Sequence, residues 1–108
     1  MVELIWTEPA LQDLDAVADY IALDNRAAAC RYVHEVFKQV ARLKSFPELG
    51  QVPAELEDFP QYRHLLVLPC RIFYKVDADR LFILHVMRRE RQFRLGRVIG
   101  RDADQPQT

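Results

Sequence analysis

The segment from residue 70 to residue 91, CRIFYKVDADRLFILHVMRRER, constrains the fold of this chain more than any other stretch. β-Branched and aromatic residues dominate both of its halves, and the DAD sequence at 77–79 between them is typical of a tight turn. The pattern therefore predicts a β-hairpin. Its second strand runs directly into Arg88, Arg89 and Arg91, with a single glutamate among them. Arginines at the end of an apolar strand favour an anionic ligand, commonly phosphate or carboxylate.

The residues before the hairpin predict one strand and two helices. Residues 2–6, VELIW, have the pattern of a short strand with every second side chain on one face. Thr7 can cap a first helix, in which apolar residues then recur at helical spacing. Asn25 ends that helix or caps the next, which we expect from about residue 26 to residue 45. Because the connection is short, the two helices are expected to form an antiparallel hairpin.

The order of predicted elements indicates the fold class. Residues 62–68 form the next strand, and the hairpin follows it, so the order is β-α-α-β-β-β. This order predicts an α+β fold in which a helical hairpin packs on a small, mostly antiparallel, four-stranded sheet. After residue 91 the apolar pattern fits either a short helix or a further strand. We expect one domain, residues 1–101, and a disordered tail, residues 102–108.

Composition excludes several classes of protein. Half of the residues are hydrophobic and 29% are charged, which is typical of a globular domain rather than a disordered chain. No apolar run approaches the roughly 18 residues that a membrane span requires. The N-terminus also lacks the layout of a signal peptide, so we expect a soluble, cytoplasmic protein. Cys30 and Cys70 lie within regular patterns and are expected to be small buried residues rather than a disulfide pair.

The net charge of −1 conceals an uneven distribution of charge. Residues 1–60 carry five basic and eleven acidic side chains, whereas residues 61–101 carry ten basic and three acidic side chains. The remaining tail adds two acidic side chains. This division predicts that one surface meets an anionic partner while another stays solvated.

Strand alternation sorts the candidate side chains of the hairpin. Arg71 is expected on the face opposite Cys70 and Ile72, either with its stem packed on the sheet or in contact with an anion. His85 is expected with Leu81, Ile83 and Met87, while Arg88 is expected with Phe82, Leu84 and Val86. His34, His64 and His85 lie on different elements without the paired spacing of a zinc site, and no glycine-rich phosphate loop is present. No metal or cofactor is therefore expected.

The whole series of segments resembles the RelE/ParE superfamily of bacterial type II toxins, in its ParE-like or plasmid-stabilisation branch. The resemblance covers residues 2 to about 95. It begins with the opening WTEPALQDLDAVADYIA, the alanine-rich helix RAAACRYV and the helix stop FPELG, and it continues with YRHLLV, RIFYKV and ILHVMRRER. No single piece is specific, but their order and spacing together are.

The resemblance implies a toxin that a cognate antitoxin neutralises, usually within a toxin–antitoxin hetero-oligomer. In this superfamily the C-terminal segment of the antitoxin wraps across the helices and sheet of the toxin. The superfamily then divides by target. RelE-like members cleave mRNA on the ribosome without metal, and ParE-like members poison DNA gyrase and block replication.

The RelE pattern is matched only in part. Arg71 matches the arginine of the first hairpin strand, and Arg89 matches the arginine that follows the last strand. The lysines of the pattern have no counterpart in residues 51–62, which carry three acids instead, and the tyrosine position falls on Leu95. If the chain is a ribonuclease, the candidate catalytic residues are Arg71, Arg89, His64, His85 and Glu90.

Three functions follow from these observations. The favoured one is a non-enzymatic toxin that inhibits DNA gyrase, for which no catalytic residue is expected. The second is a metal-free, ribosome-dependent endoribonuclease, and both of these predict growth arrest. The third is a non-toxic member that acts only as an antitoxin-binding or regulatory module. For the favoured function the candidate target-binding residues are Arg63, Arg71, Arg88, Arg89 and Arg91.

Overall fold

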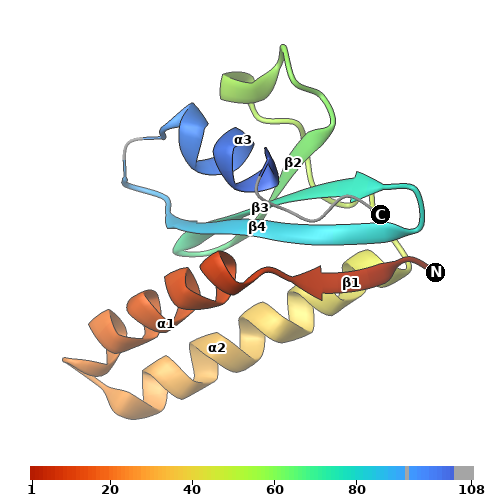
Figure 1. Ribbon diagram of the computed structural model, residues 1–108. Coiled ribbons are helices and arrows are strands. Elements are labelled where there is room, and N and C mark those ends of the chain that lie inside the picture. The colour runs from red at the N-terminus through yellow and green to blue at the C-terminus, as the bar shows by residue number, and fades with distance from the viewer. Residues whose placement is uncertain (92, 104–108) are drawn as a thin grey trace.

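A computed structural model describes residues 1–91 and 93–103 of the chain (Figure 1). A strand and two helices come first, three strands follow, and a third helix ends the described part. Single 3-10 turns lie at Arg42–Lys44 and Ala54–Leu56. The elements are β1 (Glu3–Trp6), α1 (Glu8–Ala22), α2 (Arg26–Ala41), β2 (Tyr62–Val67), β3 (Cys70–Asp77), β4 (Arg80–Arg88) and α3 (Leu95–Ala103).

The four strands form one sheet in the order β1-β4-β3-β2. β1 runs parallel to β4, whereas β2 pairs with β3 and β3 with β4 in antiparallel fashion. A parallel pair needs a long crossover, and strands β2 and β3 together with the α1–α2 hairpin supply it. The predicted α+β fold with a mostly antiparallel sheet is confirmed.

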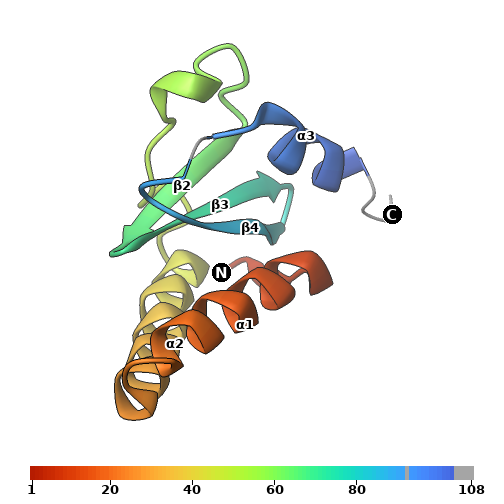
Figure 2. The same ribbon diagram turned by 90° about the vertical axis from the view of Figure 1, so that its left-hand side faces the viewer.

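The sheet is covered on both faces. Helices α1 and α2 pack on one face, and α3 lies across the other (Figures 1 and 2). One apolar cluster joins α1 and α2 to the sheet through residues such as Leu14, Val36 and Ile83. The second cluster lies under α3 and includes Phe73 and Val98. The chain therefore has two apolar layers with the sheet between them.

The segment that the sequence left open between helix and strand is the helix α3. Val98 is fully buried, and Asp102 accepts hydrogen bonds from the Tyr62 hydroxyl at 2.7 Å and from Lys75 Nζ at 3.0 Å. These contacts hold the end of the helix against β2 and β3. α3 thus extends through residue 103, into the segment expected to be a tail, and residues 104–108 of that segment lie outside the described residues.

The predicted helix starts are confirmed, but one prediction about burial is wrong. The Thr7 hydroxyl accepts a hydrogen bond from Ala10 N at 3.4 Å, and Asn25 Oδ1 accepts one from Ala28 N at 2.9 Å. Cys70 is buried as expected, whereas Cys30 is exposed. The apolar stripe of α2 faces the sheet through Ala29 and Val36, and Cys30 follows Ala29 directly, so the 100° step of the helix turns its thiol outward.

The turn between β3 and β4 contains a strained alanine. Ala78 adopts a φ of 56°, a left-handed conformation that is unfavourable for residues other than glycine, because they carry a Cβ atom. We expect Ala78→Gly to raise the free energy of unfolding by about 0.5–1 kcal/mol, because relief of this strain exceeds the added flexibility of the unfolded chain. Urea unfolding measures the change. Ala18→Gly within α1 is the matched control and should lower stability by about 1 kcal/mol; equal losses in both variants would contradict the expectation.

Candidate functional site: an arginine-lined pocket

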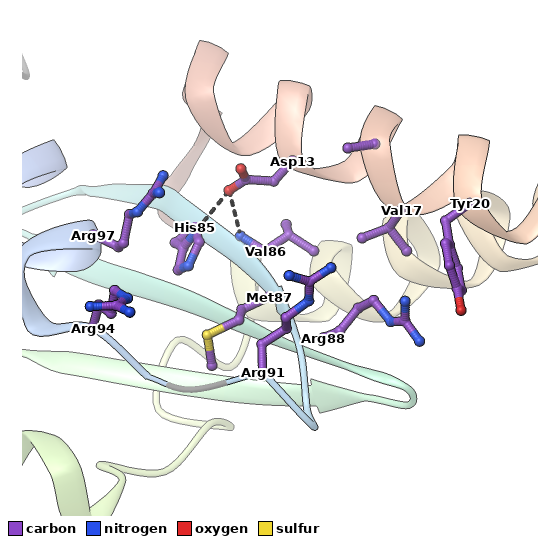
Figure 3. Close-up of a pocket in the computed structure, with 11 residues that line it drawn as sticks. Asp13, Val17, Tyr20, His85, Val86, Met87, Arg88, Arg91, Arg94 and Arg97 are labelled. Atoms are coloured by element: carbon purple, nitrogen blue, oxygen red, sulfur yellow. Dashed lines mark hydrogen bonds and ion pairs between the residues drawn. The ribbon is translucent and has the colours of Figure 1, made fainter.

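A cavity of about 490 Å³ lies between α1, the end of β4 and the segment that leads into α3 (Figure 3). Its wall on one side is a helix face, and its wall on the other side is a series of arginines. We call it the arginine pocket. Its lining residues are Asp13, Ala16, Val17, Tyr20, His85, Val86, Met87, Arg88, Arg91, Arg94 and Arg97.

The charge of the arginine pocket is strongly positive. Its arginines recur at every third position from Arg88 to Arg97, and α1 contributes one acidic side chain, Asp13. Of these arginines, Arg91, Arg94 and Arg97 are exposed and form no ion pair with any residue in 1–91 or 93–103. The pocket therefore offers several guanidinium groups that no carboxylate of the described chain neutralises.

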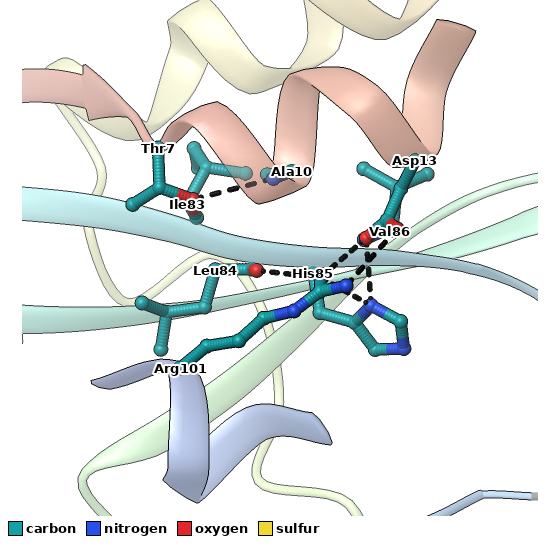
Figure 4. Close-up of polar contacts among 8 residues, drawn as sticks. All are labelled: Thr7, Ala10, Asp13, Ile83, Leu84, His85, Val86 and Arg101. Carbon is teal, nitrogen blue, oxygen red and sulfur yellow. Dashed lines mark hydrogen bonds and ion pairs between the residues drawn. The ribbon is translucent and has the colours of Figure 1, made fainter. Parts of the chain in front are cut away.

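A polar cluster closes one end of the pocket and joins three elements (Figure 4). Asp13 of α1 lies with Oδ2 2.8 Å from His85 Nδ1 of β4 and accepts a hydrogen bond from Val86 N at 3.1 Å. Arg101 of α3 donates to both oxygens of Asp13 and also to the Leu84 carbonyl at 3.0 Å. The cluster ties α1 and α3 to the same point of β4.

This cluster supplies hydrogen bonds that a neighbouring strand would otherwise make with the outer edge of β4. β1 pairs with β4 only from Arg80 to Ile83, so the outer edge of β4 beyond Ile83 lacks a ladder partner. Buried main-chain groups need hydrogen-bond partners. Here the Asp13 carboxylate accepts a hydrogen bond from the N–H of Val86, and Arg101 donates one to the carbonyl of Leu84. Side chains from α1 and α3 thus hydrogen-bond to β4 beyond the point where its pairing with β1 ends.

The ionisation of Asp13 follows from the same contacts. Burial alone would raise the pKa of this carboxyl group, but hydrogen bonds from His85, Arg101 and Val86 N outweigh burial and hold the pKa below its usual value. The carboxylate is therefore charged at neutral pH. It neutralises Arg101 rather than the arginines at the other end of the pocket.

The predicted face of His85 is right for Met87, which packs with Phe73 in the cluster under α3, but wrong for Leu81 and Ile83, and a β-bulge is the reason. Phe73 pairs with His85 but Tyr74 pairs with Ile83, so Leu84 is an extra residue in β4. A bulge shifts the alternation of side chains by one position. His85 therefore stacks on Phe73 on the α3 side of the sheet, at 5.8 Å between ring centroids, and Ile83 lies on the α1–α2 side.

The same shift changes the neighbours of Arg88. Val86 belongs to the α1–α2 side as Arg88 does, but Phe82 and Leu84, which were expected on that face, pack in the cluster under α3. The Arg88 guanidinium lies 4.0 Å from the centroid of the Tyr20 ring of α1 and forms an ion pair with Glu90 at 2.6 Å. Arg88 is thus the one pocket arginine held against a carboxylate in the described chain.

Arg71 is an interior residue rather than a surface contact. Its side chain is buried, with 8% of the residue exposed, and its guanidinium carbon lies 4.9 Å from the centroid of Phe73 and 5.7 Å from that of Phe93. Both Nη atoms donate to the Glu55 carboxylate at 2.9 Å, and Nε donates to His64 Nδ1 at 3.0 Å. Three of the five N–H donors of the Arg71 guanidinium, including the pair that would bind an anion end-on, are therefore directed to the chain itself.

The other candidate arginines differ in how far their side chains are accessible to a partner. Arg63 Nη1 donates to the Gly50 carbonyl at 2.8 Å and so supports the loop before β2. Arg89 is exposed, and its main-chain N–H donates to the Pro69 carbonyl at 2.8 Å. The structure therefore leaves the side chains of Arg89 and Arg91 open to solvent and directs those of Arg63 and Arg71 inward. Glu90, a ribonuclease candidate, pairs with Arg88.

His64 gives the cluster around Arg71 a dependence on pH. Burial and the positive charge of Arg71 lower the pKa of His64, so the folded protein binds this proton more weakly than the unfolded chain does. Stability is therefore retained above the unfolded pKa of about 6.5 and is lost as the pH falls below it. His64→Asn keeps an oxygen that can accept the Arg71 hydrogen bond but removes the titrating group.

We expect the free energy of unfolding of the unmodified protein to decline between about pH 7 and pH 5, and that of His64→Asn to decline less. Urea unfolding at the two pH values measures both slopes. His34→Asn on α2 is the matched control. An identical decline in His64→Asn and in the unmodified protein would show that His64 does not carry the effect.

Comparison with known proteins identifies the family. A family model described as the ParE toxin of type II toxin–antitoxin systems, parDE, matches residues 4–93. The chain belongs to this family. The sequence of the toxin is also 31% identical over 88 residues to a protein named Toxin RelE2 from Caulobacter vibrioides, covering 82% of this chain and 92% of that protein.

A solved structure agrees with the fold of the toxin. The chain matches a structure titled "Chromosomal ParDE TA system from P. aeruginosa" with a TM-score of 0.70 and 29% sequence identity. The match covers 83% of this chain and 98% of that chain. The predicted membership of the RelE/ParE superfamily is confirmed. Arg94, Arg97 and Arg101 lie beyond residue 93, where the family match ends.

The described residues contain no group of three or more histidine, cysteine or acidic side chains placed to hold a metal ion. No helix of that same part of the toxin is long and apolar enough to cross a membrane.

Several residues of the arginine pocket were not predicted from the sequence. Arg94 and Arg97 were not singled out, although the three-residue period that begins at Arg88 was a visible signal. Asp13 and Tyr20 carried no signal, because only the packing of α1 on β4 brings them to the site.

Proposed function

We propose that this toxin inhibits DNA gyrase, and so replication, by binding rather than by catalysis. The ParE family to which the chain belongs is described as the toxin of parDE systems, and the solved relative is titled a ParDE toxin–antitoxin system. A cognate antitoxin would neutralise the toxin in a cytoplasmic hetero-oligomer. A role in plasmid stabilisation is compatible with this proposal.

The choice of target rests on one observation, the internal pairing of the Arg71 guanidinium with Glu55. An RNA phosphate held by this arginine would have to displace the Glu55 carboxylate from a bidentate contact at 2.9 Å. It would also have to reach a side chain buried between Phe73 and Phe93. Cleavage of RNA without metal depends on cations placed on the phosphate. An arginine that is already paired internally supports binding of a protein target over catalysis.

Arg88, Arg89 and Arg91 are the proposed contacts with the target. They lie together where β4 ends, and Arg89 and Arg91 are exposed. Arg63 and Arg71 instead hold the loop before β2 through Gly50 and Glu55. Arginine is enriched in the residues that dominate protein interfaces, which agrees with this arrangement.

A supercoiling assay with purified gyrase tests the proposal. The toxin should inhibit supercoiling or accumulate cleaved DNA, and Arg89→Gln and Arg91→Gln should weaken inhibition by about tenfold each. Arg31→Gln on the exposed side of α2 is the matched control and should inhibit as the unmodified toxin does. Normal supercoiling at excess folded toxin would refute the proposal.

One observation favours a second candidate, a ribosome-dependent endoribonuclease. The relative from Caulobacter vibrioides is named Toxin RelE2, and in this chain a histidine, His64, lies 3.0 Å from the Nε atom of Arg71. Release of Glu55 would free two donors of Arg71 for a phosphate, with Arg89 as the second arginine. A translating extract tests this candidate: mRNA should be cut, and Arg89→Ala should abolish cutting. Intact mRNA in the extract would remove the candidate.

A further inference from the structure

The arginine pocket carries more positive charge than the carboxylates of the described residues neutralise. Arg91, Arg94 and Arg97 have no carboxylate partner within residues 1–91 and 93–103. The one acidic side chain in the lining, Asp13, is engaged by His85 and Arg101. Guanidinium groups gathered around one cavity repel each other, and this repulsion is relieved when an anion binds among them.

The position of two of these arginines increases the unfavourable electrostatics. Arg94 directly precedes α3, and Arg97 lies in its first turn, which contains no acidic residue. The beginning of a helix carries partial positive charge and is stabilised by anions, so cations placed there are unfavourable. This arrangement would weaken α3 in isolation, and an anion in the pocket would offset the effect.

The shape of the pocket limits the class of anion. A volume of about 490 Å³ falls within the range of small-molecule sites. On the α1 side, Ala16 and Val17 form an apolar wall. Tyr20, a residue that is 55% exposed, adds an aromatic ring on the same helix (Figure 3). A compact ligand with several adjacent negative charges fits this combination better than a single carboxylate.

The acidic residues of α1 do not oppose such a ligand. The residues of α1 that line the pocket, Asp13, Ala16, Val17 and Tyr20, lie on one face of the helix, since 13 and 16, 13 and 17, 16 and 20, and 17 and 20 are three or four positions apart. Asp15 and Asp19 are exposed and do not line the pocket. Asp13 is therefore the only acidic side chain of α1 that lines the pocket.

From these observations we propose that the arginine pocket binds the polyphosphate group of a small molecule, with Arg91, Arg94 and Arg97 as its principal donors. A nucleoside triphosphate and inorganic triphosphate share this chemistry. Planar guanidinium groups bind phosphate oxygens through paired, charge-assisted hydrogen bonds. The site goes beyond the proposed function, since the pocket would bind polyphosphate whether the cellular target is gyrase or the ribosome.

Isothermal titration of the full-length toxin with ATP and, separately, with inorganic triphosphate tests the proposal. Both ligands should bind, with affinities that fall as salt is added. Arg94→Gln and Arg97→Gln should each weaken binding by about tenfold. Both residues are exposed, so the variants are expected to fold, and circular dichroism checks this. Arg31→Gln on α2 is the matched control and should bind as the unmodified toxin does.

Two further probes separate a built site from general attraction between charges. Hexaglutamate tests for any flexible polyanion, and a short DNA duplex tests for a nucleic-acid surface. The proposal is overturned if neither triphosphate binds, if hexaglutamate or the duplex binds as tightly as both, or if Arg31→Gln weakens binding as much as Arg97→Gln. Tighter binding of ATP than of inorganic triphosphate would support a contact between the nucleoside and the apolar wall.

Discussion

Asp13→Ala is expected to lower the free energy of unfolding by about 3 kcal/mol. The substitution removes the acceptor of the Val86 N–H, the partner of His85 Nδ1 and the carboxylate that Arg101 binds. Val86 N would then lie at the unpaired edge of β4 without an acceptor, and the Arg101 guanidinium would lose its carboxylate while it keeps the Leu84 carbonyl and the contact with His85 Nδ1 at 2.8 Å. Urea unfolding monitored by circular dichroism measures the loss.

Hydrogen exchange distinguishes this mechanism from a general weakening of α1. Because Arg101 is on α3, Asp13→Ala should accelerate exchange in α3 as well as in α1. Asp15→Ala, on the exposed side of α1, is the matched control and should change stability by less than about 0.5 kcal/mol. If the two variants are equally stable, the cluster of Asp13, His85 and Arg101 does not join the elements as described.

Arg71→Ala is the second substitution with a large expected effect, a loss of about 2–3 kcal/mol. It removes two hydrogen bonds to Glu55 and one to His64, and it leaves a void beside Phe73 and Phe93. Glu55 is partly exposed and can regain water, which keeps the loss below that of a fully buried ion pair. Urea unfolding of the single variants Arg71→Ala and Glu55→Ala and of the double variant isolates the coupling between the two side chains.

We expect the two losses not to add, with a coupling of about 1 kcal/mol or more. Arg89→Ala, an exposed arginine of the same region, should leave stability nearly unchanged. A further expectation follows for function: folded Arg71→Ala should still inhibit the target, since this guanidinium is directed inward. Strict additivity of Arg71→Ala and Glu55→Ala would contradict the internal pairing.

The sequence was sufficient to predict the fold because its signals are local. Thr7 and Asn25 cap their helices through residues three positions away, and the hairpin is recognised from β-branched and aromatic residues on either side of a short turn. Local signals did not show whether the segment after residue 91 is a helix or a strand. Its helical state depends on Val98 packing under the sheet and on Asp102 reaching Tyr62, which are contacts distant in sequence.

The candidate site could be predicted only in part, for the same physical reason. Arg88 and Arg91 were recognised from a local run of arginines, and the structure places both in the pocket. The neighbours of His85 were not recognised, because a bulge at Leu84 reverses the expected faces and depends on how β4 meets β3. The partner of Arg71 was not recognised either, since Glu55 lies in a loop whose position has no local signal.

The order in which cellular processes stop tests the proposed target most directly. The toxin is expressed without its antitoxin in growing bacteria, and labelled thymidine and methionine report DNA synthesis and protein synthesis over time. If the toxin inhibits gyrase, DNA synthesis should stop first while protein synthesis continues, and an Arg91→Gln variant should delay the arrest. Immediate arrest of protein synthesis, with DNA synthesis declining only afterwards, would contradict inhibition of gyrase and favour a target on the ribosome.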